Sequence, residues 1–449
     1  MGNESARISR AAGTIRALRH RNFRLFFAGQ LISVIGTWMQ MIAQSWLVYR
    51  ITGSTVLLGL VGFASQIPVF ILAPLGGMVA DHRNRHRILV ATQTLSMVLA
   101  FGLAGLTLGG MIRVWEIFAL AVLLGLVNAF DIPARQAFVF DMVGKDDLMN
   151  AIALNSSMVN GARIVGPAVA GILVAAVGEG WCFLINAVSY VAVIAGLVAM
   201  TPIPFRRPVS TNSPLQNIVE GFRFSIRARP IRALLILLGA ISFLGMPYAV
   251  LMPVFADKIL HGGAKALGVL MGASGVGALL GSLSLASKSG VRGLGRWVGL
   301  SATGFGLSLV AFSLSRSYWL SIVLLMPVGF TMMVEMAASN TLIQAMVPDE
   351  LRGRVMALYS MMFIGMAPFG SLVAGALADR IGAPGAVASG GLVCIVAGIA
   401  FGFRLPLLRG EARELIVAHT LAGGEPAEEI TTVRGSTSSA AAESGSGRR

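Results

Sequence analysis

The chain has 449 residues, of which 55% are hydrophobic and 12% are charged, and its formal net charge is +15. About a quarter of the residues in an average soluble protein are charged, so this composition excludes an ordinary soluble domain. The basic charge does not gather on a polar domain, which argues against a nucleic-acid-binding protein. The composition therefore indicates a protein that lies within a membrane.

Long uncharged segments follow one another along the chain. About 20 apolar residues are enough to cross a bilayer as a helix, and ten segments of at least 18 residues contain no Asp, Glu, Lys or Arg. Two further apolar segments, near 114–135 and 149–177, are interrupted within the apolar run by a charge, Asp131 in the first and Arg163 in the second, and the first also has Glu116 and Arg135 near its ends. Because a backbone amide in lipid must find its partner within its own segment, the sequence predicts an all-α membrane protein with twelve transmembrane helices. The ten uncharged segments are 25–49, 51–80, 88–112, 181–205, 233–256, 266–287, 297–315, 317–334, 355–378 and 381–403.

The expected organisation divides the spans into two groups of six. It comprises a polar N-terminal tail (1–20), a first six-helix bundle (21–201), a proline-containing linker (202–230), a second six-helix bundle (231–405) and a polar tail (406–449). We expect the C-terminal tail to be largely disordered, because its end consists of Ser, Ala and Gly. Within the linker, apolar residues at helical spacing predict an amphipathic helix on the membrane surface.

Lys and Arg are distributed unevenly over the predicted loops. If the N-terminus is inside, 28 of the 35 Lys and Arg lie in cytoplasmic segments, six lie outside, and Arg163 lies within the membrane. The positive-inside rule favours this orientation. Both termini and the linker are therefore expected in the cytoplasm, and the protein in the inner (plasma) membrane.

An internal repeat at an offset of 204 residues relates the two predicted bundles. It pairs Asp131 with Glu335, and its register continues without a gap over about 50 residues. Since the repeat spans six helices, both copies have the same orientation, as in transporters that hold substrate between pseudo-symmetric halves. Chance matching in an apolar sequence is the alternative. Further pairs are Gly125 with Gly329, Ser156 with Ser360, Met158 with Met362 and Gly166 with Gly370.

A signature occupies the connection between the second and third predicted helices. Residues 77–87 read Gly-Met-Val-Ala-Asp-His-Arg-Asn-Arg-His-Arg, which resembles the G-x-x-x-D-R-x-G-R-R signature of the major facilitator superfamily, with departures at His82 and Asn84. The resemblance implies a latch in which Asp81 meets the positive N-terminus of the eleventh helix and holds the outward-facing state. A plain basic loop is the alternative. The latch residues are Gly77, Asp81, Arg83, Arg85 and Arg87.

Three further segments, 22–30, 131–135 and 160–167, narrow the resemblance. They read Asn-Phe-Arg-Leu-Phe-Phe-Ala-Gly-Gln, Asp-Ile-Pro-Ala-Arg and Asn-Gly-Ala-Arg-Ile-Val-Gly-Pro. They are similar to the drug:proton antiporter branch that includes macrolide-efflux and enterobactin-exporter-like proteins. The resemblance covers about 15–405 and implies export of a hydrophobic or amphipathic drug or siderophore by proton antiport with alternating access. Metabolite uptake or facilitated diffusion, and a non-transporting membrane sensor or assembly partner, are the alternatives.

Rare intramembrane charges are the strongest functional indication within the spans. A charge there costs at least about 2.5 kcal/mol on insertion scales, so it usually faces a cavity and has a partner. We expect Asp131 to pair with Arg135 or Arg163 in a way that changes with conformation and couples proton movement to transport. Glu335 is the equivalent carboxylate of the second half. A purely structural ion pair is the alternative.

Polar residues recur at helical spacing along the otherwise apolar first helix. Because a polar stripe facing lipid is costly, we expect it to line the central cavity or, alternatively, to form hydrogen bonds with neighbouring helices. Bulky Met, Phe and Tyr side chains elsewhere suit an amphipathic solute. The cavity-lining candidates are Gln30, Ser33, Thr37, Gln40, Gln44, Asn128, Ser156, Asn160, Tyr248 and Tyr359.

Small residues on the fifth helix indicate close helix packing. Gly161, Gly166, Pro167 and Gly171 approximate an antiporter motif that ends G-P-x-x-G-G, but this chain reads G-P-x-x-x-G, with Ala170 in place of the first of the two final glycines. Such residues allow helices to approach closely and slide. The sequence contains no catalytic set, metal-ligand cluster or nucleotide loop. We therefore expect a monomeric, lipid-embedded protein that is not an enzyme, holds no metal or cofactor, and has a small-molecule substrate and protons as its partners.

Overall fold

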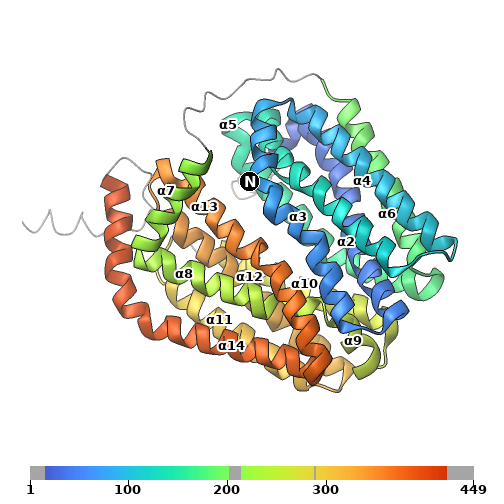
Figure 1. The fold of residues 1–449 in the computed structure, drawn as a ribbon. Helices are drawn as coiled ribbons and strands as arrows, with labels where there is room; N and C mark the ends of the chain where they lie inside the picture. The colour runs from blue at the N-terminus through green and yellow to red at the C-terminus, as the bar shows by residue number, and fades with distance from the viewer. Residues whose placement is uncertain (1–15, 202–213, 288–289, 422–449) are drawn as a thin grey trace, which may run out of the picture.

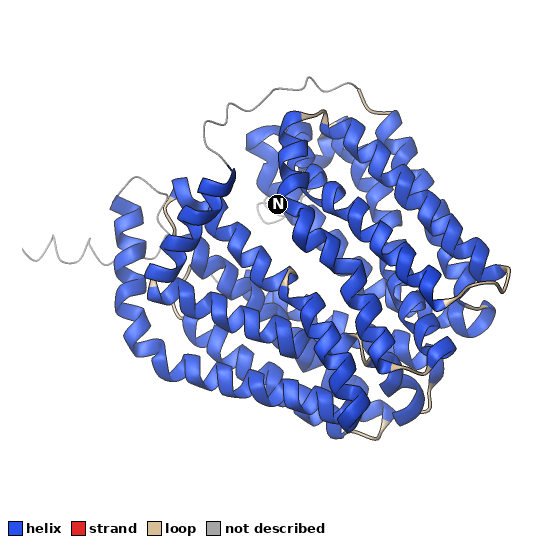
Figure 2. Ribbon diagram, viewed as in Figure 1, coloured by secondary structure: helices blue, strands red, loops and turns tan. Residues whose placement is uncertain are grey.

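The structure, a computed structural model, describes residues 16–201, 214–287 and 290–421. Within these ranges the chain is helical, with short turns and no strand, as Figure 2 shows. This confirms the all-α prediction. The remaining parts of the predicted tails and linker lie outside the described residues.

Ten helices are long and apolar enough to cross a membrane. One of them, Val114–Val177, has 64 residues, and another, Leu351–Val417, has 67. At a rise of about 1.5 Å per residue each is about three times as long as a hydrocarbon core of ~30 Å. Gly144 (φ 71°) breaks the first and Gly382 (φ 79°) breaks the second, in backbone conformations that a residue with a Cβ rarely adopts. The second is also interrupted by a turn at Gly365. Two crossings in each of these two helices would bring the ten to the predicted twelve.

The helices of the first half are separated by short turns. A 3₁₀ turn, η1, precedes them, and the amphipathic helix α7 follows them in the part of the predicted linker that the structure describes. The bounds are η1 Arg16–Arg19, α2 Arg21–Thr52, α3 Thr55–His82, α4 Arg85–Leu108, α5 Val114–Val177, α6 Glu179–Val198 and α7 Pro214–Arg227.

The second half begins with a broken crossing, Arg229–Ile259. Pro247 and Pro253 lie inside it, and proline both lacks the N–H donor and clashes with the preceding turn. The crossing is therefore divided into short α, π and 3₁₀ segments. The bounds are α8 Arg229–Ala240, η2 Ile241–Gly245, η3 Met246–Ala249, α9 Met252–Val254, η4 Phe255–Ile259, α10 Gly263–Ala286, α11 Leu294–Leu314, α12 Tyr318–Met346, α13 Asp349–Ile364 and α14 Met366–Leu421.

Two bundles stand side by side in Figure 1, α2 to α6 in blue and green and α8 to α14 in green to red. Across the interface, α5 packs on α10 and α3 packs on α14. Small residues permit both contacts: a Cβ added to Gly171 of α5 would lie 2.9 Å from Gly268 Cα of α10, and one added to Gly59 of α3 would overlap the Ser371 carbonyl of α14. This two-bundle arrangement confirms the predicted fold class.

We call the face where α2 begins and α7 lies the linker side, and the other face the opposite side (Figure 1). Near the opposite side the halves are joined: Thr55 Oγ1 donates to the Gly375 carbonyl at 3.0 Å, and the Lys258 ammonium lies 5.8 Å from the Tyr49 ring centroid. On the linker side, in contrast, the described ion pairs and hydrogen bonds stay within one half or the other. The two bundles diverge toward this side in Figure 1.

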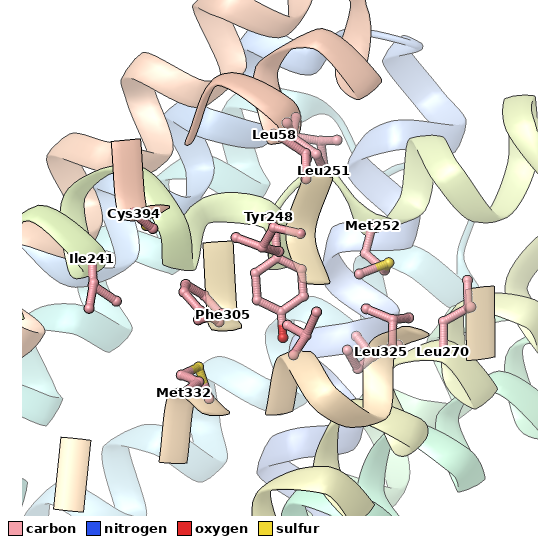
Figure 3. Packing of buried hydrophobic residues seen from close by; sticks show 14 of the residues in the cluster. Leu58, Ile241, Tyr248, Leu251, Met252, Leu270, Phe305, Leu325, Met332 and Cys394 are labelled. Carbon is pink, nitrogen blue, oxygen red and sulfur yellow. The ribbon is translucent and has the colours of Figure 1, made fainter. Parts of the chain in front are cut away.

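The largest buried apolar cluster lies mainly in the second half. Figure 3 shows Tyr248 at its centre, with Phe305, Met332 and Leu325 around it. The Tyr248 and Phe305 rings meet edge to face, with centroids 6.4 Å apart. Leu58 of α3 belongs to the same cluster, so the core of the second half continues across the interface.

The C-terminal part of α14 differs from the predicted tail. Residues 406–421, expected to be polar and largely disordered, continue as helix. Ala412, Leu415 and Ile416 pack against the main apolar cluster, and the Glu411 carboxylate accepts from the backbone N–H of Arg229 at 3.0 Å. An acceptor at the N-terminus of α8 satisfies an amide that has no partner within that helix, which explains why this stretch is ordered.

Candidate functional site

A buried polar network surrounds Asp131 in the first half. The residue is only 2% exposed. Its Oδ1 accepts from Thr92 Oγ1 and Gln93 Nε2 of α4, both at 2.8 Å, and its Oδ2 lies 3.3 Å from Arg135 Nη2. Arg135 Nη1 donates in turn to Gln30 Oε1 of α2 at 3.2 Å. The carboxylate therefore links three helices, and it pairs with Arg135 rather than with Arg163.

The sequence prediction did not include Thr92 and Gln93. They are adjacent polar residues in an otherwise apolar segment, which was the available signal. Their partner could not be read from spacing along one helix, because it lies on another helix whose rotation about its own axis depends on packing.

Glu335 is the equivalent residue of α12, and it is 1% exposed. Its Oε1 accepts from Ser339 Oγ at 3.0 Å. Ser339 stands where the offset of 204 places Arg135 in the first half, so the cation of the first half is replaced by a hydroxyl group. Among the described residues Glu335 has no salt-bridge partner, and an ionised carboxylate buried without a cation is costly.

Arg163 of α5 lies where the two halves meet. Its guanidinium carbon is 5.8 Å from the centroid of the Trp38 ring on α2, and its Nη2 is 4.0 Å from the sulfur of Met332 on α12. In the described part of the chain no carboxylate lies within salt-bridge distance of it. The predicted pairing with Asp131 is absent in this conformation.

The polar stripe of α2 is divided between two environments. Gln30, Ser33 and Gln40 are buried, and Gln40 Oε1 accepts from Asn186 Nδ2 of α6 at 2.7 Å. Gln30 and Gln40 therefore bind helices of their own half, as in the hydrogen-bonding alternative. Thr37 is exposed and donates to the Ser33 carbonyl at 3.0 Å, while Gln44 is partly buried.

The other cavity candidates also fall into two groups. Ser156 is exposed and Asn160 is partly buried on one face of α5, and Asn160 Nδ2 donates to the Ser156 carbonyl at 2.9 Å. Tyr248 and Tyr359 are buried. The Tyr248 hydroxyl lies 2.8 Å from Ser274 Oγ, and the Tyr359 hydroxyl donates to the Met336 carbonyl at 2.8 Å. Asn128 is partly buried on α5.

The signature between α3 and α4 is stabilised within the first half. Arg85 Nη1 lies 2.8 Å from Asp141 of α5, and its Nη2 lies 3.4 Å from Asp81. The Asp81 side chain is 56% exposed. Asn84, which departs from the signature, accepts from the backbone N–H of Arg87 and so caps α4. Gly77 is partly buried, and Arg83 and Arg87 are exposed.

The small residues of α5 contact two different helices. A Cβ added to Gly166 would lie 2.5 Å from the Trp38 Cβ of α2, whereas Gly171 and the Pro167 carbonyl face Gly268 of α10. Gly161 has open space around it. Three of the four residues therefore allow close helix approach, two of them at the interface between the halves.

Comparison with known proteins agrees with this architecture. Residues 12–438 match the model of a family described as transmembrane secretion effector (MFS_3). The chain is 28% identical over 364 residues to the staphyloferrin A transporter of Staphylococcus aureus (strain NCTC 8325 / PS 47), which covers 80% of this chain and 90% of that protein. It is 25% identical over 384 residues to the enterobactin exporter EntS of Shigella boydii serotype 4 (strain Sb227), covering 85% and 91%.

Solved transporter structures share the fold. The nucleoside transporter NupG has a TM-score of 0.67 at 13% identity, covering 86% of this chain and 99% of that one. A bacterial homologue of the human lysosomal transporter Spinster, in an inward-facing and unoccupied conformation, has a TM-score of 0.60 at 14% identity, covering 89% and 98%. The chain belongs to the transmembrane secretion effector family of the major facilitator superfamily, and it is a membrane transporter, not an enzyme.

Proposed function

We propose that the protein exports an amphipathic small molecule of the siderophore or drug type by proton antiport with alternating access. The observation that carries the proposal is the pair of buried carboxylates, Asp131 and Glu335, at equivalent positions of the two halves. Buried ionisable groups within spans are typical of proton pathways. The family membership and the siderophore substrates named for two relatives support the solute class.

The orientation follows from the basic residues. The linker side carries most of the Lys and Arg, so the positive-inside rule makes it the cytoplasmic side. Both termini then lie in the cytoplasm of the inner (plasma) membrane. The joined opposite side faces outward, and the diverging bundles correspond to an inward-facing state that can take up solute from the cytoplasm.

The two carboxylates have different roles in this proposal. No cation of the described residues lies beside Glu335, so an exchangeable proton is the simplest way to avoid an isolated buried charge. Around Asp131, in contrast, lie two hydrogen-bond donors and the cation of Arg135, which compensate a charge on this carboxylate. Glu335 is therefore the primary proton carrier, and Asp131 with Arg135 responds to movement of the helices that hold them.

The signature residues act as a latch for the other conformation. In this state the ion-pair partner of Asp81 among the described residues is Arg85 of its own half. When the linker side closes, Asp81 reaches the N-terminus of α13, where the helix dipole favours an anion. Arg83, Arg85 and Arg87 balance its charge and bind anionic lipid. The protein works as a monomer.

Export is tested in cells. A strain that lacks the gene and a strain that overexpresses it are compared for accumulation of staphyloferrin A, enterobactin and a panel of inhibitory compounds. Overexpression lowers accumulation of at least one compound, and a protonophore restores it. Higher accumulation on overexpression would instead support uptake, and no flux in purified proteoliposomes would support the sensor alternative.

A further inference from the structure

A guanidinium group with no carboxylate partner in the described part of the chain lies between the halves. Arg163 contacts Trp38 and Met332, which are carried by helices of different halves. Neither partner carries a charge, and the sulfur is a weak acceptor at 4.0 Å. The two buried carboxylates of the proposed proton pathway have other partners: Asp131 pairs with Arg135, and Glu335 accepts a hydrogen bond from Ser339.

Such a partly buried group is costly unless an anion or water reaches it. A cation inside a span needs a partner or water, and an uncompensated buried charge destabilises a protein by several kcal/mol. If residue 163 only packed α5 against α2 and α12, a Met or Leu at this position would make the apolar contacts without the cost of a buried charge. The charge itself therefore requires an explanation beyond packing.

Its position suggests what that explanation is. Ser156, Asn160 and Arg163 follow one another at spacings of four and three, so they share one face of α5. Ser156, about two turns nearer the linker side, is exposed. At Arg163 and beyond it, α5 closes on α10: a Cβ added to Gly275 would lie 3.1 Å from the Arg163 carbonyl oxygen, and one added to Gly171 would lie 2.9 Å from Gly268 Cα. Arg163 thus lies at the closed end of a polar face that begins on the linker side.

We propose that Arg163 binds a carboxylate or comparable oxyanion of the transported solute, with the Trp38 ring packing against the adjacent apolar part. A guanidinium donates two parallel hydrogen bonds to a carboxylate, and an indole ring can lie against it at the same time. This assignment rests on the proposed transport function and narrows its solute class to amphipathic anions. In this assignment Arg163 binds the solute, whereas the sequence prediction made it a possible partner of Asp131.

The test measures equilibrium binding to the full-length protein in lipid nanodiscs, without a proton gradient. The probes are naphthalene-2-carboxylate and naphthalene-2-carboxamide, which differ in charge and are close in shape. The wild-type protein binds the carboxylate about tenfold more tightly or better, because each factor of ten needs only about 1.4 kcal/mol. Arg163→Gln abolishes the preference without loss of amide binding, and Arg163→Lys retains part of it. Arg380→Gln, at an exposed position, removes the same charge and leaves the preference unchanged.

Three outcomes overturn the assignment: equal binding of both probes to the wild type, a preference that survives in Arg163→Gln, or no binding of either probe at millimolar concentration. The amide serves as the control for folding of the variants. Because the measurement uses no gradient, its failure leaves proton-coupled export of an uncharged solute intact. Loss of export in cells together with a preserved charge preference would refute the proposed function alone.

Discussion

Asp131 and Glu335 occupy equivalent positions in the two halves, but among the residues that the structure describes a cation lies beside Asp131 and none beside Glu335. Arg135 is 3.3 Å from Asp131, whereas its counterpart Ser339 donates to Glu335 at 3.0 Å. The charge of the first carboxylate is balanced by an arginine. The second has only a hydroxyl group beside it among the described residues, so a bound proton is what would remove its charge. We expect this asymmetry in a carrier whose second half binds the proton, while the ion pair of its first half changes when the helices move.

Glu335→Gln is expected to uncouple transport from the pH gradient. The amide mimics the neutral form permanently, so the solute still binds but the proton gradient cannot drive its export. Gradient-dependent export should fall about 5- to 150-fold, which corresponds to typical coupling energies. Export in inverted membrane vesicles with and without an imposed pH gradient measures this. Ser339→Ala is the matched control, since it removes the hydrogen bond and keeps the carboxyl group. Unimpaired gradient-driven export by Glu335→Gln would exclude this residue as the proton carrier.

Gly59→Ala is expected to open the opposite side. The added methyl group would overlap the Ser371 carbonyl of α14, so the packing of α3 on α14 must loosen. Spin labels at the opposite-side ends of these helices should then report a longer distance in a larger fraction of molecules. Gly102→Ala on α4 meets open space and should leave the distribution unchanged. Identical distributions for Gly59→Ala and wild type would show that this contact does not set the conformation.

The ion pair between Arg50 and Glu179 should respond asymmetrically to removal of its partners. Arg50 Nε lies 2.6 Å from Glu179, whose side chain is 6% exposed, while that of Arg50 is 55% exposed. Arg50→Gln leaves a buried carboxylate unpaired and should lower the free energy of unfolding by about 1–3 kcal/mol. Glu179→Gln leaves a cation that water can reach and should lower it by less than about 1 kcal/mol. Unfolding in detergent micelles measures both, and equal losses would contradict the burial argument.

Asp81→Asn is expected to enrich the inward-facing state. Loss of a contact with a helix N-terminus, worth about 0.3–1 kcal/mol at an exposed site, changes the population ratio about two- to fivefold. Distances between spin labels on the linker-side ends of α3 and α13 report the change. Asp141→Asn removes the other carboxylate beside Arg85 within the same half and should have the smaller effect. An unaltered distance distribution in Asp81→Asn would argue for a plain basic loop.

The spans and their grouping were predictable because the physical demand on them is local. A segment in lipid must be apolar along its whole length, so the absence of charge located the crossings, and the repeat that pairs Asp131 with Glu335 related the halves. Charged residues beside Gly144 and Gly382, such as Lys145 and Arg380, indicated a boundary between spans there. The break at a single glycine was not predicted, because it depends on a positive φ within an otherwise continuous helix. The division of the seventh crossing followed from Pro247 and Pro253, whose effect depends on how neighbouring helices satisfy the freed backbone.

The site was less predictable because its partners come from different helices. Spacing alone placed Gln30 and Gln40 on one stripe, but packing turned both toward their own half. The same uncertainty left Asp131 with two possible cations, and the structure pairs it with Arg135. Which side of the interface is open depends on the balance between whole bundles, and no local pattern encodes it.

Proton movement measured in proteoliposomes is the most direct test of the central claim. The purified protein is reconstituted with a pH-sensitive dye inside, and the solute identified by the cell assay is added outside without any imposed gradient. Antiport predicts that solute entry drives protons out, so the lumen becomes alkaline in the wild type but not in Glu335→Gln. Solute entry with no change of luminal pH, or with acidification, would contradict the account.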